Sequence, residues 1–388
     1  MCFVADRWER MRIERRLEQP RWLLVAVPVG SLAFAFLAMA VVLVATGHDP
    51  WSEYRRLFDA AFVGKGALTS TFVFATPIVF TGLAAAVAFR MQLFNIGGEG
   101  QLYLGAIGAT GVGVYFADHG VGSTWLFVLL MCAGGMLAGS AWAAIPAVLR
   151  ADLRTNEIIT SLMLNYVAGI LLNYLIIDSH SYWRDTETFE GQTFPLGKTL
   201  VDAASWPSRT FDVTGGIVVP LGFGLAIAAA VLLWFLYSRT RFGFEVQVIG
   251  DSARAAHYAG MRMRRKILAV MCLSGAIAGL GGASVEGDFA HQLDPKGLQD
   301  SFYGYTGIVV AALARYNPLA VCLVGFLLGG LQNAGFALQG VDFPSGLVGV
   351  LQGLILFSAL GGELLVRYRV RLGRRARIPA TPAPEAAP

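Results

Sequence analysis

Ten apolar runs divide this chain of 388 residues. A helix needs about 20 mostly apolar residues to cross the hydrocarbon core of a bilayer, which is near the length of most of these runs. Because lipid offers no hydrogen-bond partners, a spanning segment must satisfy its backbone internally. The sequence therefore predicts an all-α polytopic membrane protein with about ten transmembrane helices, at residues 22–46, 71–89, 95–116, 124–148, 156–177, 217–238, 267–285, 302–314, 318–338 and 344–365.

The composition agrees with a membrane protein. Hydrophobic residues make up 55% of the chain and charged residues 14%, and the mean hydropathy is +0.58. Soluble proteins carry about 25% charged residues. The four cysteines are scattered and the five histidines lie in separate loops, so neither a disulfide framework nor a metal site is expected. No nucleic acid partner is expected.

A polar stripe crosses the fifth apolar run. Glu157, Ser161, Asn165, Gly169 and Asn173 follow one another at intervals of four residues, and on a helix they cover about 24 Å of its axis. Amide and carboxyl groups are costly in hydrocarbon unless they meet polar partners or water. The stripe must therefore face the interior of a bundle or an aqueous path, which indicates a transporter or channel subunit. We assign its four polar side chains to the substrate path.

The third run begins with the glycine-rich segment FNIGGEGQ, residues 94–101. Its three glycines weaken a helix, and its polar side chains are Asn95, Glu99 and Gln101. Transporters use interrupted helices at membrane depth to hold substrates. We therefore expect a broken third span whose polar residues join the path; a turn at the cytoplasmic interface just after Arg90 is the alternative. The eighth run is short and is the second candidate for a broken or tilted span.

The basic residues predict the orientation in the membrane. With both termini cytoplasmic, 23 of the 30 lysines and arginines lie on the cytoplasmic side, as the positive-inside rule requires. This divides the chain into a basic cytoplasmic N-terminus (1–21), a transmembrane domain (22–366) and a cytoplasmic tail that we expect to be disordered (367–388). Residues 178–215 form an extracytoplasmic loop that either contacts a soluble partner or is simply solvated, and residues 239–266 form a cytoplasmic loop.

The loop at 239–266 contains a short predicted helix from Asp251 to about Met261. Asp251 or Ser252 caps its N-terminus and Gly260 ends it. A short surface helix between two spans fits a groove on a cytoplasmic partner. A basic anchor lying on anionic lipid headgroups is the alternative.

Smaller signals concern packing. Residues 50–66 predict an amphipathic helix on the extracytoplasmic membrane surface. Amides in the last two spans either line the path or tie helices together, namely Gln332, Asn333, Gln339 and Gln352. Three small-xxx-small pairs predict close helix contacts: Gly135 with Gly139, Gly275 with Gly279, and Gly325 with Gly329.

A phosphate-binding loop is not expected. The segment GQTFPLGKT at 191–199 has five residues between its glycines, where that loop requires four, and no strand precedes it. If ATP drives transport, another chain hydrolyses it.

Three motifs in order resemble the membrane permease subunits of ABC importers for nucleosides and simple sugars. They are FNIGGEGQLYLGAIGA, TNEIITSLMLNYVA and the stretch from RTRFGFEVQVIGDSARAAHYAG to SGAIAGLGGA. The resemblance covers about residues 71–361 and extends to the broader group of ribose and branched-chain amino acid permeases. It implies a permease fold resembling the ribose and vitamin B12 permeases, in a bacterial cytoplasmic (inner) membrane.

The resemblance also implies partners. It implies a cytoplasmic ABC ATPase that holds the ATP, a second permease subunit and an extracytoplasmic substrate-binding protein, with no cofactor on this chain. The FNIG and NEIITSLMLNY forms are closest to nucleoside permeases, so a heterodimer is favoured over a homodimer. The expected substrate is a nucleoside or related simple sugar, with a ribose-like sugar or a flavin as alternatives.

The resemblance assigns coupling to the ATPase to part of the cytoplasmic loop. The family's motif corresponds to the spacing of Ala255, Ala256 and Gly260, with Asp251 and Arg254 beside it. Arg254 replaces an acidic residue that is common in the broader family.

The sequence disfavours two other classes of protein. A membrane-embedded enzyme requires a catalytic cluster, and no spaced histidine or aspartate cluster faces a common side. A secondary transporter usually shows an inverted repeat, whereas the similar stretches 82–90 and 307–315 have the same predicted orientation. Both patterns favour a transport subunit without covalent chemistry.

Overall fold

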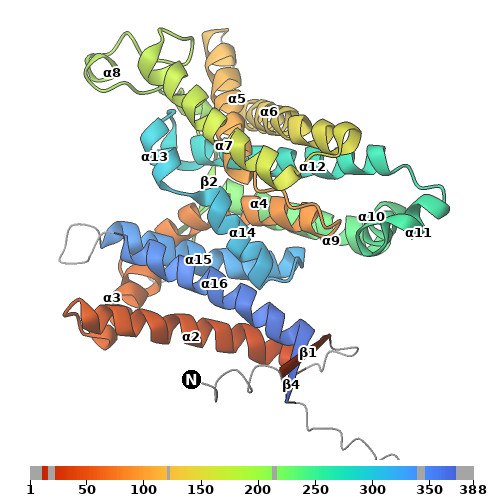
Figure 1. Ribbon diagram of the computed structural model, residues 1–388. Helices are drawn as coiled ribbons and strands as arrows, with labels where there is room; N and C mark the ends of the chain where they lie inside the picture. The colour runs from red at the N-terminus through yellow and green to blue at the C-terminus, as the bar shows by residue number, and fades with distance from the viewer. Residues whose placement is uncertain (1–10, 16–21, 120–122, 212–215, 339–345, 373–388) are drawn as a thin grey trace, which may run out of the picture. The chain divides into compact units, whose positions relative to one another are not determined.

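The computed structural model describes residues 11–15, 22–119, 123–211, 216–338 and 346–372. Helices dominate the fold (Figure 1). Each of the ten apolar runs contains one, in chain order α2 (Leu23–Ala45), α4 (Ala67–Phe89), α5 (Gly98–Asp118), α6 (Thr124–Leu153), α7 (Glu157–Asn173), α9 (Leu221–Arg239), α12 (Met263–Val285), α14 (Tyr303–Leu313), α15 (Pro318–Ala337) and α16 (Leu347–Arg367).

Six of the described helices are long and apolar enough to cross a bilayer, which confirms a mostly helical, multi-pass membrane protein. The two irregular spans differ from each other. α14 has 11 residues, about 16 Å of axis, so it is indeed short. α5 is continuous over 21 residues, so no break lies within it. The non-helical residues are 90–97, between α4 and α5, which is the position of the turn after Arg90 that was the alternative.

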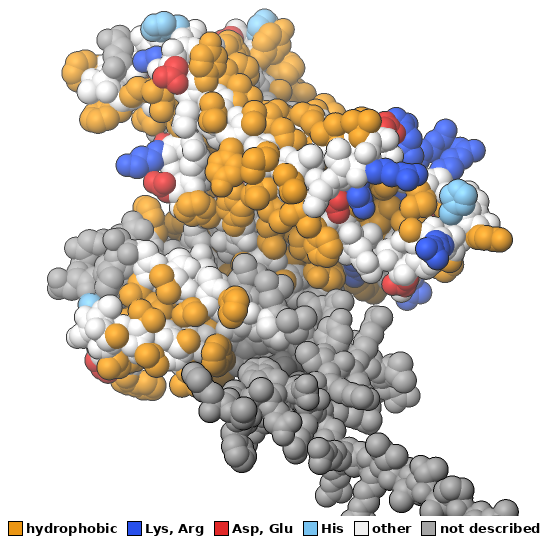
Figure 2. Space-filling view, in the orientation of Figure 1, with side chains coloured by type: hydrophobic (Ala, Val, Ile, Leu, Met, Phe, Trp, Pro, Cys, Tyr) orange, Lys and Arg blue, Asp and Glu red, His pale blue; other side chains and the backbone are white. Residues whose placement is uncertain are grey.

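Helix α4 lies at the centre of the larger compact unit, residues 39–353. It contacts α12, α14, α15 and α9, and Figure 1 shows it between α12 and α15. Its sequence has no charged residue and is apolar all round, which is typical of a helix surrounded by others. The outer helices α6, α7 and α9 expose apolar side chains instead. Figure 2 shows the broad apolar surface on the side of this unit that faces the viewer.

The small-residue pairs lie where helices approach most closely. Gly275 and Gly279 of α12 lie against Gly139 and Gly135 of α6. A Cβ atom at Gly279 would lie 2.2 Å from the carbonyl oxygen of Gly135. The third pair, in α15, lies against α4, where a Cβ atom at Gly329 would lie 2.5 Å from Ala75 Cα and one at Gly325 would lie 2.6 Å from Val79 Cγ2. The predicted close contacts are therefore confirmed, and glycine permits them by the absence of a side chain.

The loops between the spans are folded onto the bundle. The amphipathic helix predicted after the first span is α3 (Pro50–Phe58), continued by the π-helical turn η1 (Asp59–Val63). The long loop after α7 contains α8 (Phe189–Thr193), a 3-10 turn η3 (Asp202–Ala204) and a hairpin of β2 (Ser208–Phe211) and β3 (Ile217–Pro220). Trp206 of this loop packs in a cluster with Phe127 and Met131 of α6, so a substantial part of the loop is anchored.

A smaller compact unit joins the two ends of the chain, residues 1–38 and 354–388. Strands β1 (Met11–Arg15) and β4 (Tyr368–Leu372) pair antiparallel. Ser31 of α2 lies against Gly362 of α16. Most of the predicted basic N-terminus, and the predicted disordered tail from residue 373 onward, lie outside the described residues.

Candidate functional site

Two amides meet at the non-helical segment before α5. Asn95 Nδ2 donates a hydrogen bond to Gln101 Oε1, and Gln101 Nε2 donates one to Asn95 Oδ1, both at 3.0 Å. Asn95 Nδ2 also donates to Ser274 Oγ of α12 at 2.9 Å, and Ser274 Oγ donates to the carbonyl oxygen of Ala84 in α4. The pair therefore joins this segment to α12 and α4.

Side chains of the α7 stripe form hydrogen bonds with backbone groups at the start of α5 and in the non-helical segment before it. Ser161 Oγ accepts one from Ile96 N at 3.1 Å. Asn165 Nδ2 donates to Ile96 O at 2.9 Å, while its Oδ1 accepts from Gly100 N at 2.9 Å. A buried backbone group without a partner costs about as much as a lost hydrogen bond. Ser161 and Asn165 therefore stabilise a chain conformation that apolar side chains would leave unsatisfied.

Glu99 caps a helix other than its own. Its Oε2 accepts hydrogen bonds from the backbone N–H groups of Gly304 and Tyr305, in the first turn of α14, and its Oε1 accepts one from Tyr103 Oη at 2.8 Å. The first N–H groups of a helix have no partner within that helix, and its dipole favours a negative charge at this end. This explains how a carboxyl group is accommodated inside the bundle.

The two ends of the stripe have other partners. Glu157 is the first residue of α7, and its Oε2 lies 3.2 Å from Arg150 Nε of α6. Asn173, the last residue of α7, accepts a hydrogen bond from Gln299 Nε2 at 2.9 Å. Gln299 belongs to the short helix α13 (Pro295–Asp300). These two predicted path residues therefore hold the ends of α7 and stand apart from the central group.

Five of the seven predicted path residues come together, namely Asn95, Glu99, Gln101, Ser161 and Asn165, which we call the polar cluster. Each is at most 4% exposed, and each has a hydrogen-bond partner within the chain. In this conformation they join α5, α7, α12 and α14. A solute reaches them only when those helices move apart, so their assignment to a substrate path stays a prediction.

Sequence reasoning missed several residues that complete the polar cluster. Ser274, Tyr103 and Tyr305 were not selected, although Tyr305 Oη accepts a hydrogen bond from Asn165 Nδ2 at 3.2 Å. Ser274 immediately precedes Gly275, but the two face different helices: Gly275 packs against Gly139 of α6, whereas Ser274 donates to Ala84 O of α4. The small-residue pattern of α12 therefore did not mark Ser274. The tyrosines carried no signal either, because an aromatic residue in an apolar run usually indicates packing.

Two acids, Glu286 and the partly buried Asp288, were also missed. They lie on the π-helical turn η4 (Glu286–Ala290), which continues α12. Asp288 accepts from Gly222 N at 3.1 and 3.2 Å. Glu286 is fully buried, and neither of its carboxyl oxygens has a hydrogen-bond partner among the described residues. The sequence signal that could have found them is an acidic residue at the end of an apolar run.

The predicted cytoplasmic helix is present as α11 (Ala253–Tyr258), directly after α10 (Arg241–Asp251). Ser252 is its cap and accepts a hydrogen bond from Ala255 N at 3.3 Å, so Asp251 ends α10 and does not cap α11. Gly260 has a φ of +72° where the chain turns away, a conformation that favours glycine. Ala256 is buried, whereas Arg254 and Ala255 are exposed.

Comparison with known proteins identifies the family. The sequence pattern described as the permease component of branched-chain amino acid transport systems matches residues 67–360. The chain belongs to this family. This confirms the resemblance found in the three motifs, and it makes the chain a membrane-embedded transport subunit.

Three relatives cover most of this permease. It is 35% identical to the glucose ABC transporter permease protein TsgB13 of Haloferax volcanii, over 93% of each chain. It is 32% identical to the guanosine ABC transporter permease protein NupP of Bacillus subtilis, over 79% of this chain and 84% of that protein. It is 28% identical to the nucleoside ABC transporter permease protein NupB of Lactococcus lactis, over 86% and 90%.

Bacillus subtilis and Lactococcus lactis each have a second permease protein that matches this chain. The guanosine permease protein NupQ of Bacillus subtilis is 25% identical over 68% of this chain and 80% of that protein. The nucleoside permease protein NupC of Lactococcus lactis is 25% identical over 66% and 78%. Each organism thus has two permease proteins related to this chain, and the first of each pair is the more similar.

Proposed function

We propose that this permease is the membrane-spanning subunit of an ATP-binding cassette importer that translocates nucleosides or related simple sugars. The observation that carries the proposal is the family match over 67–360, together with relatives named for guanosine, nucleosides and glucose. The alternative substrates are other small solutes, such as a ribose-like sugar or a flavin. A secondary transporter is less well supported, because ABC permeases are the relatives found.

The proposed partners follow from the same relatives. A cytoplasmic ABC ATPase hydrolyses ATP, an extracytoplasmic protein delivers the solute, and a second permease subunit completes the pair. The two related permeases in each of two bacteria support a heterodimer. The exposed residues Arg254 and Ala255 of α11, with Asp251, Ala256 and Gly260 shaping the helix, are the proposed contact with the ATPase.

The proposed path runs along the polar cluster, with Glu157 and Asn173 at its ends. Because the polar cluster is buried and hydrogen-bonded here, passage of a solute requires a second arrangement of the helices that exchanges these hydrogen bonds for bonds to solute or water. ATP and the binding protein shift the equilibrium only if each binds one arrangement better than the other.

We further propose ten spans with both termini in the cytoplasm. The antiparallel pairing of β1 with β4 supports an even number of crossings, since it brings the two ends of the chain together. In a cysteine-free background, we expect a cysteine substituted for Ser205 to react with a membrane-impermeant thiol reagent in intact cells. A cysteine substituted for Arg254 should react only after the cells are permeabilised. The reverse pattern would exclude this orientation.

The importer assignment predicts ATP-dependent uptake. Co-expressed with its ATPase, partner permease and binding protein, this chain should support uptake of radiolabelled guanosine. Unlabelled nucleosides should compete more strongly than glucose. We expect uptake to be lost when the ATPase carries an inactive nucleotide site.

The variant Gly260→Trp tests coupling to the ATPase in the same uptake measurement. Any residue with a side chain is strained at a φ of +72°, at a cost of about 1–2 kcal/mol, so the turn after α11 should shift and coupling should weaken. We expect at least a tenfold loss of uptake with normal amounts of the protein in the membrane. ATP-independent uptake by the parent chain would contradict the importer assignment.

A further inference from the structure

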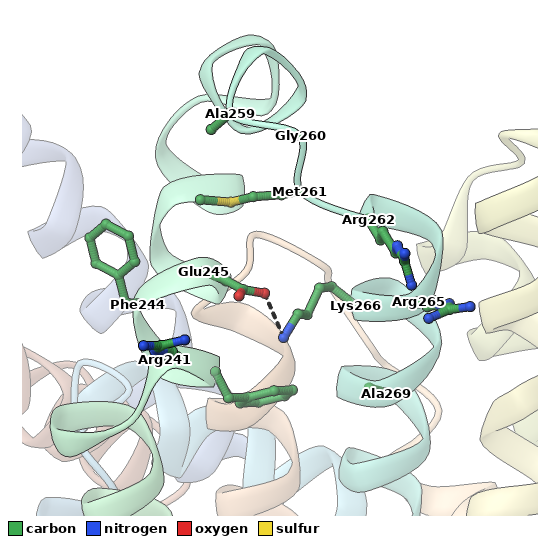
Figure 3. Close-up of a pocket in the computed structure, with 11 residues that line it drawn as sticks. Arg241, Phe244, Glu245, Ala259, Gly260, Met261, Arg262, Arg265, Lys266 and Ala269 are labelled. Carbon is green, nitrogen blue, oxygen red and sulfur yellow. Dashed lines mark ion pairs between the residues drawn. The ribbon is translucent and has the colours of Figure 1, made fainter.

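A cavity of about 760 Å³ lies between α10, the turn after α11 and the start of α12. Figure 3 shows the side chains that line it. Four are basic: Arg241, Arg262, Arg265 and Lys266. Glu245 is the one acidic residue among these described lining residues. The cavity wall therefore carries a clear excess of positive charge.

The single acid is already paired. Glu245 Oε2 lies 2.7 Å from Lys266 Nζ, and this ammonium also lies 4.6 Å from the centre of the Phe242 ring. Figure 3 shows Arg262 and Arg265 on one side of this pair and Arg241 on the other. Within the described part of the chain, their three guanidinium groups make no ion pair or hydrogen bond. A guanidinium group can bind two oxygens of a phosphate at once, so these unpaired groups suit an anion with several oxygens.

The cavity also has an apolar side that leads onto the lipid-facing surface. Ala269 is exposed about two turns into the spanning helix α12, and Phe244 of α10 is 64% exposed. In Figure 2, basic side chains gather at this end of the bundle beside a broad apolar surface. A soluble phosphate compound gains nothing from such a wall, whereas the acyl chain of a lipid buries apolar surface against it.

We propose that this cavity binds the headgroup of an anionic phospholipid from the cytoplasmic leaflet. The proposal rests on the proposed function in one respect, the cytoplasmic orientation of residues 239–266. Anionic lipids in that leaflet attract arginine and lysine near the membrane surface. Arg262 and Arg265 contact the phosphate, with Arg241 on the opposite wall, and Phe244 and Ala269 contact the acyl chains. The bound lipid fills the space beneath α11 and keeps α10 and α11 in place against α12.

The test compares two charge-matched double variants of the full-length chain, purified in a neutral detergent. Arg262→Gln/Arg265→Gln removes two charges from the cavity, and Arg154→Gln/Arg239→Gln removes two from exposed residues outside it. Short-chain phosphatidylglycerol is titrated onto each protein and followed by native mass spectrometry. We expect the cavity variant to bind phosphatidylglycerol at least tenfold more weakly than the parent chain, and the control variant to bind it like the parent. A thermal unfolding curve for each protein checks that it is folded.

Three outcomes would overturn the proposal. The first is equal binding of phosphatidylglycerol by both double variants, or equal binding of phosphatidylcholine by the parent. The second is binding of soluble glycerol phosphate as tight as that of the lipid, which would assign the cavity to a free phosphate compound. The third, measured separately by copurification of the co-expressed ATPase, is loss of ATPase capture by the cavity variant while lipid binding persists, which would make the cavity an ATPase docking surface. Because the titration contains no ATPase, binding protein or solute, failure of the importer assignment would appear in the uptake measurement instead.

Discussion

Gly279→Leu is expected to abolish assembly of this permease in the membrane. A Cβ atom at this position would lie 2.2 Å from Gly135 O and 3.1 Å from Gly139 Cα. The opposing atoms are backbone, which cannot rotate aside, so α12 and α6 must separate along their contact. Overpacking a core typically costs about 1–3 kcal/mol when side chains can rearrange, and here they cannot. Fluorescence-detected size-exclusion chromatography of detergent extracts measures the loss of the monodisperse peak.

Gly224→Leu is the matched control. Gly224 also lies in a spanning helix, α9, but a Cβ atom there would meet nothing within 4 Å. The same substitution should therefore leave the amount of protein and its elution profile unchanged. If Gly279→Leu gave a normal profile, the close contact between α12 and α6 described above would be wrong.

Glu99→Leu is expected to have the second largest effect. It removes the acceptor for Gly304 N, Tyr305 N and Tyr103 Oη. Each buried polar group left without a partner costs about 1–3 kcal/mol. We therefore expect a loss of on the order of 3 kcal/mol in the free energy of unfolding, measured as a large fall in the thermal midpoint of the purified protein.

Glu99→Gln separates the structural role of Glu99 from a role in transport. The amide oxygen can still accept from the first turn of α14, and its NH₂ group can donate to Tyr103 Oη. We therefore expect the thermal midpoint to fall much less than in Glu99→Leu. If Glu99 also contacts the solute, guanosine uptake by the Gln variant drops sharply while the protein remains folded. Parental uptake at a normal thermal midpoint would restrict Glu99 to capping α14.

The hydrophobic pattern predicted the helices well because the bilayer imposes a simple requirement on each of them. A run of about 20 apolar residues permits few alternatives to a spanning helix, and every run contains a helix. The exceptions arise where that requirement is relaxed. α14 has 11 residues, and its first turn is capped by Glu99, far away in sequence. Residues 90–97 are non-helical, and α7 side chains bind the backbone of Ile96. Both depend on contacts between distant segments.

The site was predicted in part for the same reason. Four-residue spacing correctly placed Ser161 and Asn165 on the buried face of α7, since periodicity is a local property. That spacing does not reveal what lies opposite. Pairing of Asn95 with Gln101 and of Glu99 with α14 follows from the way α5, α12 and α14 pack, and the residue types alone leave binding a solute and joining helices equally open.

The pairing of β1 with β4 also constrains the order in which the protein can be completed. Met11 pairs with Leu372, so β1 has no partner until synthesis has reached β4. At about 5–20 residues per second this delay is roughly 20–70 s. Throughout that interval α2 lacks the contact of Ser31 with Gly362 of α16. The smaller compact unit therefore forms only after the spans of the larger unit have been synthesised.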